Sequence, residues 1–200
     1  MSRSRSSARD KDEMSTPMTE NIERSADTDK SPVQGVPPEE LLDLYDINGQ
    51  PLHRTIVRGA PRTEGEYHLL VQVWVKNTQN EYLIQQRADN GLWATTAGYV
   101  IAGETSQLGA TRELAEELGI RAAPHELRQI YQDTSRYAFG TAWLLERDVA
   151  PDEICIQAEE VIETRWASQA VIRKMVEQGL FYDYGDEYFR HVFNNGNTME

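Results

Sequence analysis

The sequence predicts an α/β fold, in which helices cover both faces of a mixed β-sheet in an α/β/α sandwich. Segments of alternating apolar and polar residues stand on both sides of a central helical stretch, and a second helical pattern follows late in the chain. Alternation is typical of half-buried strands, whereas a period of 3.6 residues is typical of amphipathic helices. Strands before and after a helix suit helices that pack against one central sheet.

The N-terminal segment, residues 1–36, is rich in Ser, Arg, Asp and Glu and nearly lacks large apolar side chains. It cannot bury enough surface to fold, so we expect a disordered N-terminal tail. The interleaved acidic residues favour a solvated tail over a basic arm for nucleic acid. Pro37-Pro38 marks the start of a single folded domain, residues 37–200.

Strands are expected in seven places. Apolar residues flank a turn at Asn48-Gly49, which indicates a small hairpin within residues 39–59. In the next segment Leu69, Val71, Val73 and Val75 share one face, as expected for a strand. The segments with strand character after the hairpin are residues 68–76, 82–87, 93–97, 127–133, 137–145 and 161–166.

Two helices are expected from their end signals. Thr105 or Ser106 can cap the central helix and Gly119 can end it, while Ser168 and Gly179 bound the later one. Aromatic residues crowd the segment that follows, and we expect them to close the core or to form a dimer contact. They are Phe181, Tyr182, Tyr184, Tyr188, Phe189 and Phe193.

Composition excludes several classes of protein. With 200 residues and 39% hydrophobic residues the chain suits one packed core, and its net charge of −13 argues against broad nucleic-acid binding and against anionic membrane surfaces. No apolar run approaches the roughly 20 residues of a membrane span, and no secretory signal is visible. Cys155 is the single cysteine, which excludes a disulfide framework and favours a cytoplasmic protein. Its apolar context favours a buried or inert thiol.

Acidic side chains are concentrated on the central helix. Glu113, Glu116 and Glu117 lie within an arc of about 100°, while Leu114 and Leu118 point the other way, towards a core. Each like-charge pair at these spacings costs roughly 0.2–0.5 kcal/mol in an isolated helix. A divalent cation would reverse this penalty, because hard cations such as Mg²⁺ take carboxylate oxygens as ligands.

The segment also fits the pattern Gly-x5-Glu-x7-Arg-Glu-(apolar)-x-Glu-Glu-x-Gly-(apolar) without a gap. The matching residues are Gly98, Glu104, Arg112, Glu113, Leu114, Glu116, Glu117, Gly119 and Ile120. This pattern is the signature of the Nudix hydrolases, and the chain is identified as resembling that family. The resemblance covers roughly residues 40–180 and is specific within the motif.

The resemblance implies a function and a set of roles. Family members bind Mg²⁺ or Mn²⁺ and hydrolyse a diphosphate linkage, typically in a nucleoside diphosphate joined to another group, and dimers are frequent among them. By resemblance Glu116 and Glu117 are the main metal ligands, and the backbone carbonyl of Gly98 is a further ligand. Glu113 ligates metal or positions or deprotonates the attacking water. Arg112 holds the glutamates by ion pairing, and the remaining structural positions of the motif are Glu104 and Gly119.

Residues outside the motif supply weaker candidates. Glu160, or its neighbour Glu159, lies where such enzymes often draw another metal ligand or the base, although a solvated acidic turn is an equal alternative. Arg87 and Arg58 could each bind a substrate phosphate or form a surface ion pair. Trp93 could stack on a base, although a core position is the more common use of such a residue.

A branch of the family related to isopentenyl diphosphate isomerase shares features around His68, which matches a metal ligand of that enzyme. The catalytic cysteine of the isomerase is replaced here by Ala97, and its histidine after the motif glycine by Tyr99. The isomerase also lacks the full paired glutamates that this chain keeps. We therefore expect His68 to be a strand residue with a local hydrogen bond.

The residues together predict a metal-dependent pyrophosphohydrolase that cleaves a small-molecule diphosphate, with Mg²⁺ as cofactor and Mn²⁺ as its alternative. A metal can neutralise the phosphate oxygens and lower the pKa of a bound water, and a free carboxylate can take the proton. The alternatives are a nucleotide- or metabolite-binding module of the same fold and, more remotely, a prenyl diphosphate isomerase. The sequence does not identify the substrate.

Overall fold

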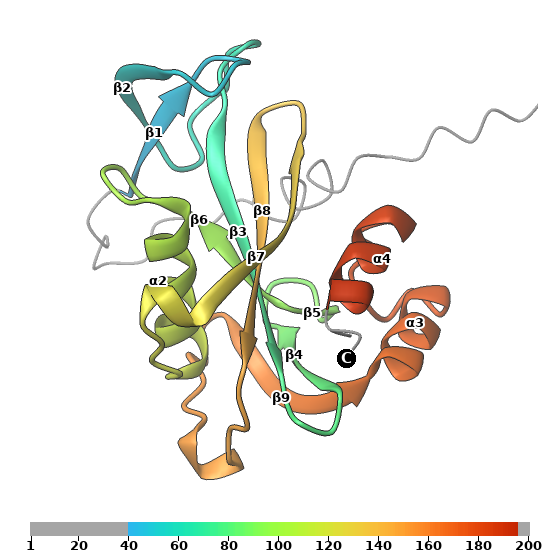
Figure 1. Cartoon of the computed structure of the whole chain (residues 1–200). Coiled ribbons are helices and arrows are strands. Elements are labelled where there is room, and N and C mark those ends of the chain that lie inside the picture. Colours follow the sequence, from blue (N-terminus) through green and yellow to red (C-terminus); the bar gives the residue numbers. More distant parts are fainter. Residues whose placement is uncertain (1–39, 196–200) are drawn as a thin grey trace, which may run out of the picture.

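The computed structural model describes residues 40–195, and its architecture confirms the predicted α/β/α sandwich (Figure 1). Helix α2 (Ser106–Leu118) lies on one side of the central sheet, and α3 (Gln169–Glu177) and α4 (Asp186–Asn195) lie on the other. Within the described part of the chain, every helix is too short or too polar to span a bilayer. The predicted tail, residues 1–36, lies outside the described residues.

The central sheet is built around β3 (His68–Lys76). Its strand order is β5-β4-β3-β8-β7, with β6 pairing to β3 and β9 pairing to β4. The β3–β8 pair is parallel and the other pairs are antiparallel, so the sheet is mixed, as predicted. The other strands are β4 (Glu81–Arg87), β5 (Trp93–Ala94), β6 (Thr96–Tyr99), β7 (Leu127–Thr134), β8 (Ala138–Glu146) and β9 (Val161–Ser168). Two short 3-10 turns lie at Pro124–Glu126 and Pro151–Glu153.

The strand expected at residues 93–97 is divided into β5 and β6, because the segment crosses from one neighbour to another. Trp93 pairs with Gln86 of β4, whereas Thr96 pairs with Val73 of β3. Thr95 lies between the two pairings, and its hydroxyl donates to the carbonyl of Val73. The crossing places β6 beside the N-terminal half of β3.

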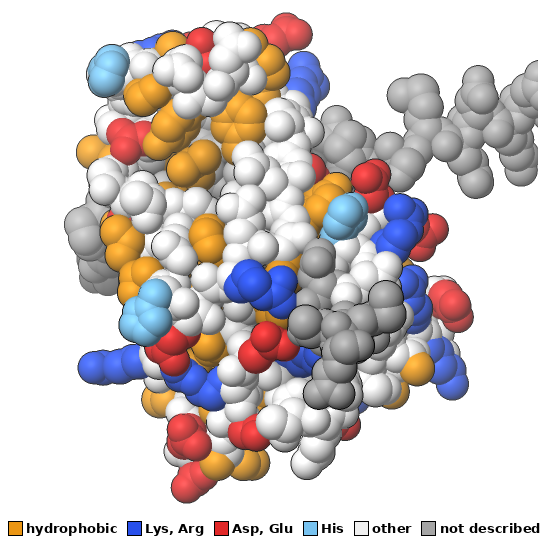
Figure 2. Space-filling model, viewed as in Figure 1, with side chains coloured by type: hydrophobic (Ala, Val, Ile, Leu, Met, Phe, Trp, Pro, Cys, Tyr) orange, Lys and Arg blue, Asp and Glu red, His pale blue; other side chains and the backbone are white. Residues whose placement is uncertain are grey.

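The expected hairpin is formed by β1 (Leu41–Tyr45) and β2 (Pro51–Val57), which make a separate two-stranded sheet. Asp46 closes its turn, since its carboxylate accepts from the backbone N–H groups of Asn48 and Gln50. Gly49 adopts φ 74°, a conformation that favours glycine. The hairpin stands at the top of the view in Figure 1, where apolar side chains gather on the surface drawn in Figure 2.

The sheet buries a different set of side chains on each face. Towards α2, the predicted row of valines on β3 packs against Leu114 and Leu118. Towards α3 and α4, Trp74 packs among the C-terminal aromatic residues, and its Nε1 donates to the hydroxyl of Tyr188 at 2.8 Å. The aromatic residues therefore close the core, which was one of the two interpretations offered for them.

Helix α4 was absent from the predicted elements. It forms because Tyr188, Phe189, Val192 and Phe193 lie on one helical face, and all four are buried. Asp186 and Glu187 stand in its first turn, where the helix dipole favours negative charge. The aromatic content of the segment was recognised from the sequence, but its helical period was not.

Candidate active site

Helix α2 has the ends that the sequence predicts. The side chain of Thr105 accepts from the backbone N–H of Leu108 at 3.3 Å, and Gly119 ends the helix in the left-handed conformation with φ 70°. Leu114 and Leu118 are buried in the core between α2 and β3. The three motif glutamates consequently project from the remaining surface of the helix, close to β6 and β4.

Arg112 holds the acidic residues together. Its Nε donates to Glu104 at 3.0 Å, and its Nη1 donates to Glu113 at 2.8 Å and to Glu116 at 3.0 Å. Its Nη2 donates to the carbonyl of Tyr99 at 2.8 Å, which ties the helix to the end of β6. Burial alone would lower the pKa of Arg112, but the ion pairs with Glu104 and Glu113 raise it, so the guanidinium is a permanent charge.

Gly98 leaves room for one of these carboxylates. A Cβ atom at this position would lie 2.2 Å from the carboxyl carbon of Glu113, which is far inside van der Waals contact. Glycine is therefore needed here for close approach and not for an unusual backbone conformation. The same contact places the backbone of β6 directly beside the glutamate cluster.

Two of the glutamates are buried and hold protons unusually well. Burial raises the pKa of Glu113 to about 7, despite the opposing charge of Arg112. Burial and the charge of Glu113 raise the pKa of Glu117 to about 8, and only 7% of Glu117 is exposed. Both carboxyl groups can thus exchange a proton near neutral pH, and strongly shifted pKa values of this kind are common at functional sites.

Gln85 of β4 is a partner that the sequence did not reveal. Its Nε2 donates to Glu117 at 2.7 Å, and its Oε1 accepts from the hydroxyl of Thr96 at 3.1 Å. The carboxamide therefore bridges α2, β4 and β6. It lies 32 positions before Glu117 in the chain, so only the folded sheet brings the two together.

The cluster fits a divalent cation in the kind and charge of its donors. Buried carboxylates that repel one another are stabilised by a metal ion, and oxygen ligands suit Mg²⁺ and Mn²⁺. Among residues 40–195, however, no three acidic, histidine or cysteine side chains already converge on one point. Glu113 and Glu116 turn to Arg112, and Glu117 turns to Gln85. A bound cation would require these side chains to reorient.

The loop that carries Glu160 is fastened to the end of α2. The backbone N–H of Cys155 donates to the backbone carbonyl of Leu118, and that of Gln157 donates to the backbone carbonyl of Glu117, both at 2.9 Å. The charge of Glu160 contributes to the raised pKa of Glu117, so the two carboxylates are close enough to interact. A buried or inert thiol was expected at Cys155, and the first alternative is wrong, because Cys155 is exposed where the loop passes over the outside of the helix end.

The two candidate phosphate-binding arginines lie near the glutamates but have acidic partners. Arg87 binds Asp89 through two hydrogen bonds of 3.0 and 2.7 Å, and its charge lowers the pKa of Glu117. Arg58 donates to Glu40 at 2.7 Å, and its charge lowers the pKa of Glu113. Both arginines are thus ion-paired, and both act electrostatically on the cluster.

Trp93 lies in the core, which was the alternative to stacking on a base. It is 8% exposed, packs in the cluster beneath α3 and α4, and has the guanidinium of Arg165 4.2 Å from its ring centroid. This packing and the cation leave little of the indole for a ligand.

His68 is buried at 2% exposure, with its ring 5.1 Å from that of Tyr99. Burial, together with the charge of Arg62, lowers the pKa of His68 to about 3, so the imidazole is neutral. A local hydrogen bond was expected for this side chain. Within the described residues its Nε2 has no such partner.

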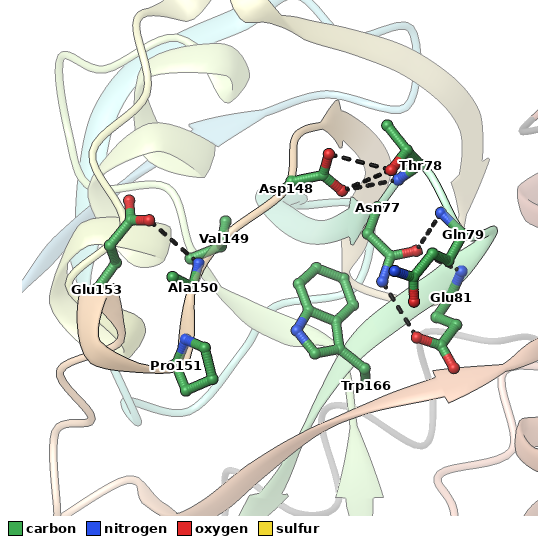
Figure 3. A pocket seen from close by; sticks show the side chains of 10 residues that line it. All are labelled: Asn77, Thr78, Gln79, Glu81, Asp148, Val149, Ala150, Pro151, Glu153 and Trp166. Carbon is green, nitrogen blue, oxygen red and sulfur yellow. Dashed lines mark hydrogen bonds between the residues drawn. The ribbon is translucent and has the colours of Figure 1, made fainter.

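A pocket lies at the other end of β3, between the turn that follows this strand and the loop after β8 (Figure 3). Trp166 of β9 forms one wall, and Asp148 accepts from the backbone and the hydroxyl of Thr78. Its lining includes none of the motif residues. It is therefore separate from the glutamate cluster.

Comparison with known proteins gives concordant results. The family model described as NUDIX domain matches residues 66–182. An uncharacterized Nudix hydrolase of Listeria monocytogenes is 30% identical over 165 residues, which is 80% of this chain and 96% of the relative. An isopentenyl-diphosphate Delta-isomerase of Corynebacterium diphtheriae is 24% identical over 157 residues, covering 71% of this chain and 86% of the enzyme. The crystal structure of DR0079 from Deinococcus radiodurans superposes with a TM-score of 0.62 at 20% identity, covering 76% of this chain and 98% of that one.

Proposed function

The chain belongs to the Nudix hydrolase family, which acts on phosphoric anhydrides, and from this premise we propose that it is a divalent-metal-dependent pyrophosphohydrolase. The proposed substrate is a small nucleoside diphosphate joined to another group, and water is the nucleophile. The supporting observation is the pair of carboxyl groups of Glu113 and Glu117, with pKa values of about 7 and 8, of which that of Glu113 abuts Gly98 and that of Glu117 is bound by Gln85.

We assign the proposed metal ligands from the motif. Glu113, Glu116, Glu117 and the carbonyl of Gly98 would hold Mg²⁺, or Mn²⁺ in its place, with Glu160 as a further candidate. The ion would supply charge for the phosphate oxygens and acidify a bound water. Release of protons from carboxyls with raised pKa values couples metal binding to pH. The choice of general base among these glutamates stays open.

The remaining motif residues position this apparatus. Arg112 keeps Glu113 and Glu116 in place by ion pairing, with Glu104 as its third acidic partner. Arg87 and Arg58 can exchange their present carboxylate partners for a substrate phosphate, because both lie within electrostatic reach of the cluster. We expect the reaction to take place in the cytoplasm, and a homodimer follows as an expectation from the family.

The test compares Glu117→Gln and Glu116→Gln with Glu177→Gln, which makes the same change at an exposed position near the end of α3. Release of phosphate-bearing products is measured with Mg²⁺ or Mn²⁺ over nucleoside di- and triphosphates, dinucleotides, sugar nucleotides and prenyl diphosphates. Removal of a metal-ligating carboxylate should lower turnover by about 10²–10⁴-fold while circular dichroism stays unchanged. The Glu177 variant should keep full activity.

Two outcomes would contradict the proposal. Undiminished turnover in both motif variants would remove the metal assignment. Stable calorimetric binding of ADP-ribose to the wild-type protein, without product, would instead indicate a binding module. The isomerase alternative has no support at its catalytic positions, since Ala97 and Tyr99 replace the required cysteine and histidine.

A further inference from the structure

Gln85 is a polar residue in the buried part of β4. It is 2% exposed, and the buried residues before it on the strand are Tyr82, Leu83 and Ile84. Leu83, two positions earlier, packs in the cluster between α2 and β3. Because alternate residues of a strand share a face, Gln85 is directed to the same side. An uncharged polar side chain therefore stands in the core beneath α2, where it meets Glu117.

The carboxamide of Gln85 is held in one orientation. Its Oε1 accepts from the hydroxyl of Thr96 at 3.1 Å, and its Nε2 donates to Oε2 of Glu117 at 2.7 Å. Reversing the amide would place its oxygen against Glu117, and an ionised carboxylate can only accept. Thr96 is itself 2% exposed, and its β-branched side chain has few rotamers. The sheet thus fixes the direction of the N–H group that Glu117 receives.

Glu117 is held at two points. Besides the bond from Gln85 to Oε2, its backbone carbonyl accepts from the N–H of Gln157 at 2.9 Å. The bond from Gln85 engages one of the two carboxylate oxygens and does not use Oε1. A carboxylate has enough lone pairs to keep such a bond and to give its second oxygen to a metal ion.

The partner of Glu117 differs in kind from that of the other motif glutamates. Glu113 and Glu116 bind the guanidinium of Arg112, whose charge offsets theirs. Gln85 is neutral, so it fixes the direction of its carboxylate without cancelling the negative charge that attracts a cation. Carboxylates that ligate metal ions are typically oriented by hydrogen bonds of this kind.

We propose that Gln85 is a positioning residue of the metal site: its carboxamide holds Oε2 of Glu117, leaves Oε1 for a divalent cation, and owes its own orientation to Thr96. The inference rests on the proposed metal-dependent hydrolysis. Gln85 acts through Glu117 and needs no contact with the ion or the substrate. Loss of its hydrogen bond should therefore lower the affinity for the metal ion and leave the reaction of the metal-loaded enzyme nearly unchanged.

The test is Gln85→Met, which keeps the approximate length of the side chain and removes the donor. Binding of Mn²⁺ is measured without substrate, by calorimetry and by the electron paramagnetic resonance signal of the free ion. The dissociation constant should rise about 10–100-fold, as is typical when a metal ligand loses its orienting hydrogen bond. The Mn²⁺ concentration that gives half-maximal turnover should rise by the same factor. At saturating Mn²⁺, kcat should change by less than about threefold.

Thr96→Val and Thr96→Ser test the orientation of the carboxamide while Gln85 stays in place, and they decide the matter if Gln85→Met does not fold. Valine has the shape of threonine without the hydroxyl, so Mn²⁺ binding should weaken. Serine keeps the hydroxyl and should bind Mn²⁺ nearly as the wild type does. In the double variant with Gln85→Met the losses should not add, because the hydroxyl acts through the carboxamide. Additive losses would overturn the role of Thr96.

The matched control is Gln86→Met, which removes a carboxamide at the next position of β4. The Nε2 of Gln86 donates to the carbonyl of Gly91 at 2.9 Å, and alternation directs this side chain away from Glu117. The control should keep the Mn²⁺ affinity and the kcat of the wild type. An unchanged Mn²⁺ dissociation constant in Gln85→Met, together with a lower melting temperature in chelator, would show that the carboxamide only stabilises the fold and would overturn the inference.

The behaviour of the wild type separates the two proposals. If it binds Mn²⁺ and cleaves a diphosphate, equal Mn²⁺ affinity in Gln85→Met overturns only the role of Gln85. If it binds Mn²⁺ but cleaves nothing, the hydrolase proposal fails and the comparison of dissociation constants still decides the role of Gln85. If it neither binds Mn²⁺ nor cleaves any diphosphate, both proposals fail.

Discussion

Two buried polar sites on opposite faces of the central sheet differ in whether their atoms have hydrogen-bond partners. On the face towards α2, Glu113 and Glu117 have Arg112 and Gln85 as partners. On the other face, Gln72 and His68 are buried with atoms that have no partner among the described residues. The difference is that neighbouring elements supply partners for the carboxylates of the first site, whereas the described residues supply none for these atoms of the second. Changes on the side towards α2 test the partnered half of this comparison.

The largest effect on stability is expected from Arg112→Ala. The variant leaves the carboxylates of Glu104, Glu113 and Glu116 without their cation, and loss of the shared partner from this partly buried ion-pair network costs roughly 2–3 kcal/mol. Urea unfolding at neutral pH measures the change. Arg112→Lys should recover only part of it, because an ammonium cannot reproduce the fork of a guanidinium. Full recovery by lysine would mean that charge alone matters here.

Gly98→Ala should follow in size. The added methyl group meets the Glu113 carboxylate, and overpacking of this kind costs about 1–3 kcal/mol and should displace the carboxylate from the site. Activity should fall with stability. The control is a double-mutant cycle with Glu113→Ala, which removes the colliding atoms. If Gly98→Ala costs as much in the Glu113→Ala background, the clash is not the cause.

The raised pKa values of the glutamates predict how stability changes with pH when a chelator is present. Between about pH 4.5 and 8, the folded protein retains protons on Glu113 and Glu117 that the unfolded chain releases, so stability falls as pH rises. Glu117→Gln cannot ionise at this position. The free energy of unfolding of this variant, minus that of the wild type, should therefore rise by about 1–3 kcal/mol between pH 5 and pH 8.

Excess Mg²⁺ or Mn²⁺ should stabilise the wild type at pH 8 more than at pH 5, since the ion competes with protons for the carboxylates. Thermal unfolding with and without the metal measures this difference. Without metal, the difference in free energy of unfolding between Glu117→Gln and the wild type should depend on pH. A pH-independent difference would contradict the burial of an ionisable group at Glu117.

The smallest effects compare the caps of helices on the two faces. Thr105 caps α2 and Ser168 caps α3 through similar hydrogen bonds of 3.3 and 3.4 Å. Substitution of either residue by alanine should cost about 1 kcal/mol, measured by urea unfolding. Only Thr105→Ala should also lower turnover, because α2 carries the glutamates. Equal losses of turnover in both variants would indicate a general effect of stability.

Local signals were sufficient for most of the fold. Thr105, Gly119 and Ser168 marked helix ends correctly because caps depend on a few adjacent residues. The valines of β3 marked its face towards α2 because alternation is a property of the strand itself. The pairing of Arg112 with its glutamates was also predicted, from the resemblance of the motif to the Nudix signature.

Features that depend on contacts between residues far apart in the sequence could not be predicted. Gln85 reaches Glu117 only because α2 packs against the face of the sheet that includes β4, and no local pattern marks it. The partnerless state of Gln72 follows from which elements cover the sheet, and the sequence shows only a polar residue within a strand. Helix α4 is different, because its 3.6-residue period is a local pattern. The many aromatic residues just before and within the helix made this period hard to recognise.

Strand β6 has a consequence for how new specificities can arise in this scaffold. Alternate residues of a strand face opposite ways, so deleting or inserting one residue before Gly98 would turn the glycine away from Glu113 and swing a neighbouring side chain into its place. The spacing of this segment is therefore rigidly constrained. Changes of substrate selectivity must therefore keep the segment before Gly98 at its present length.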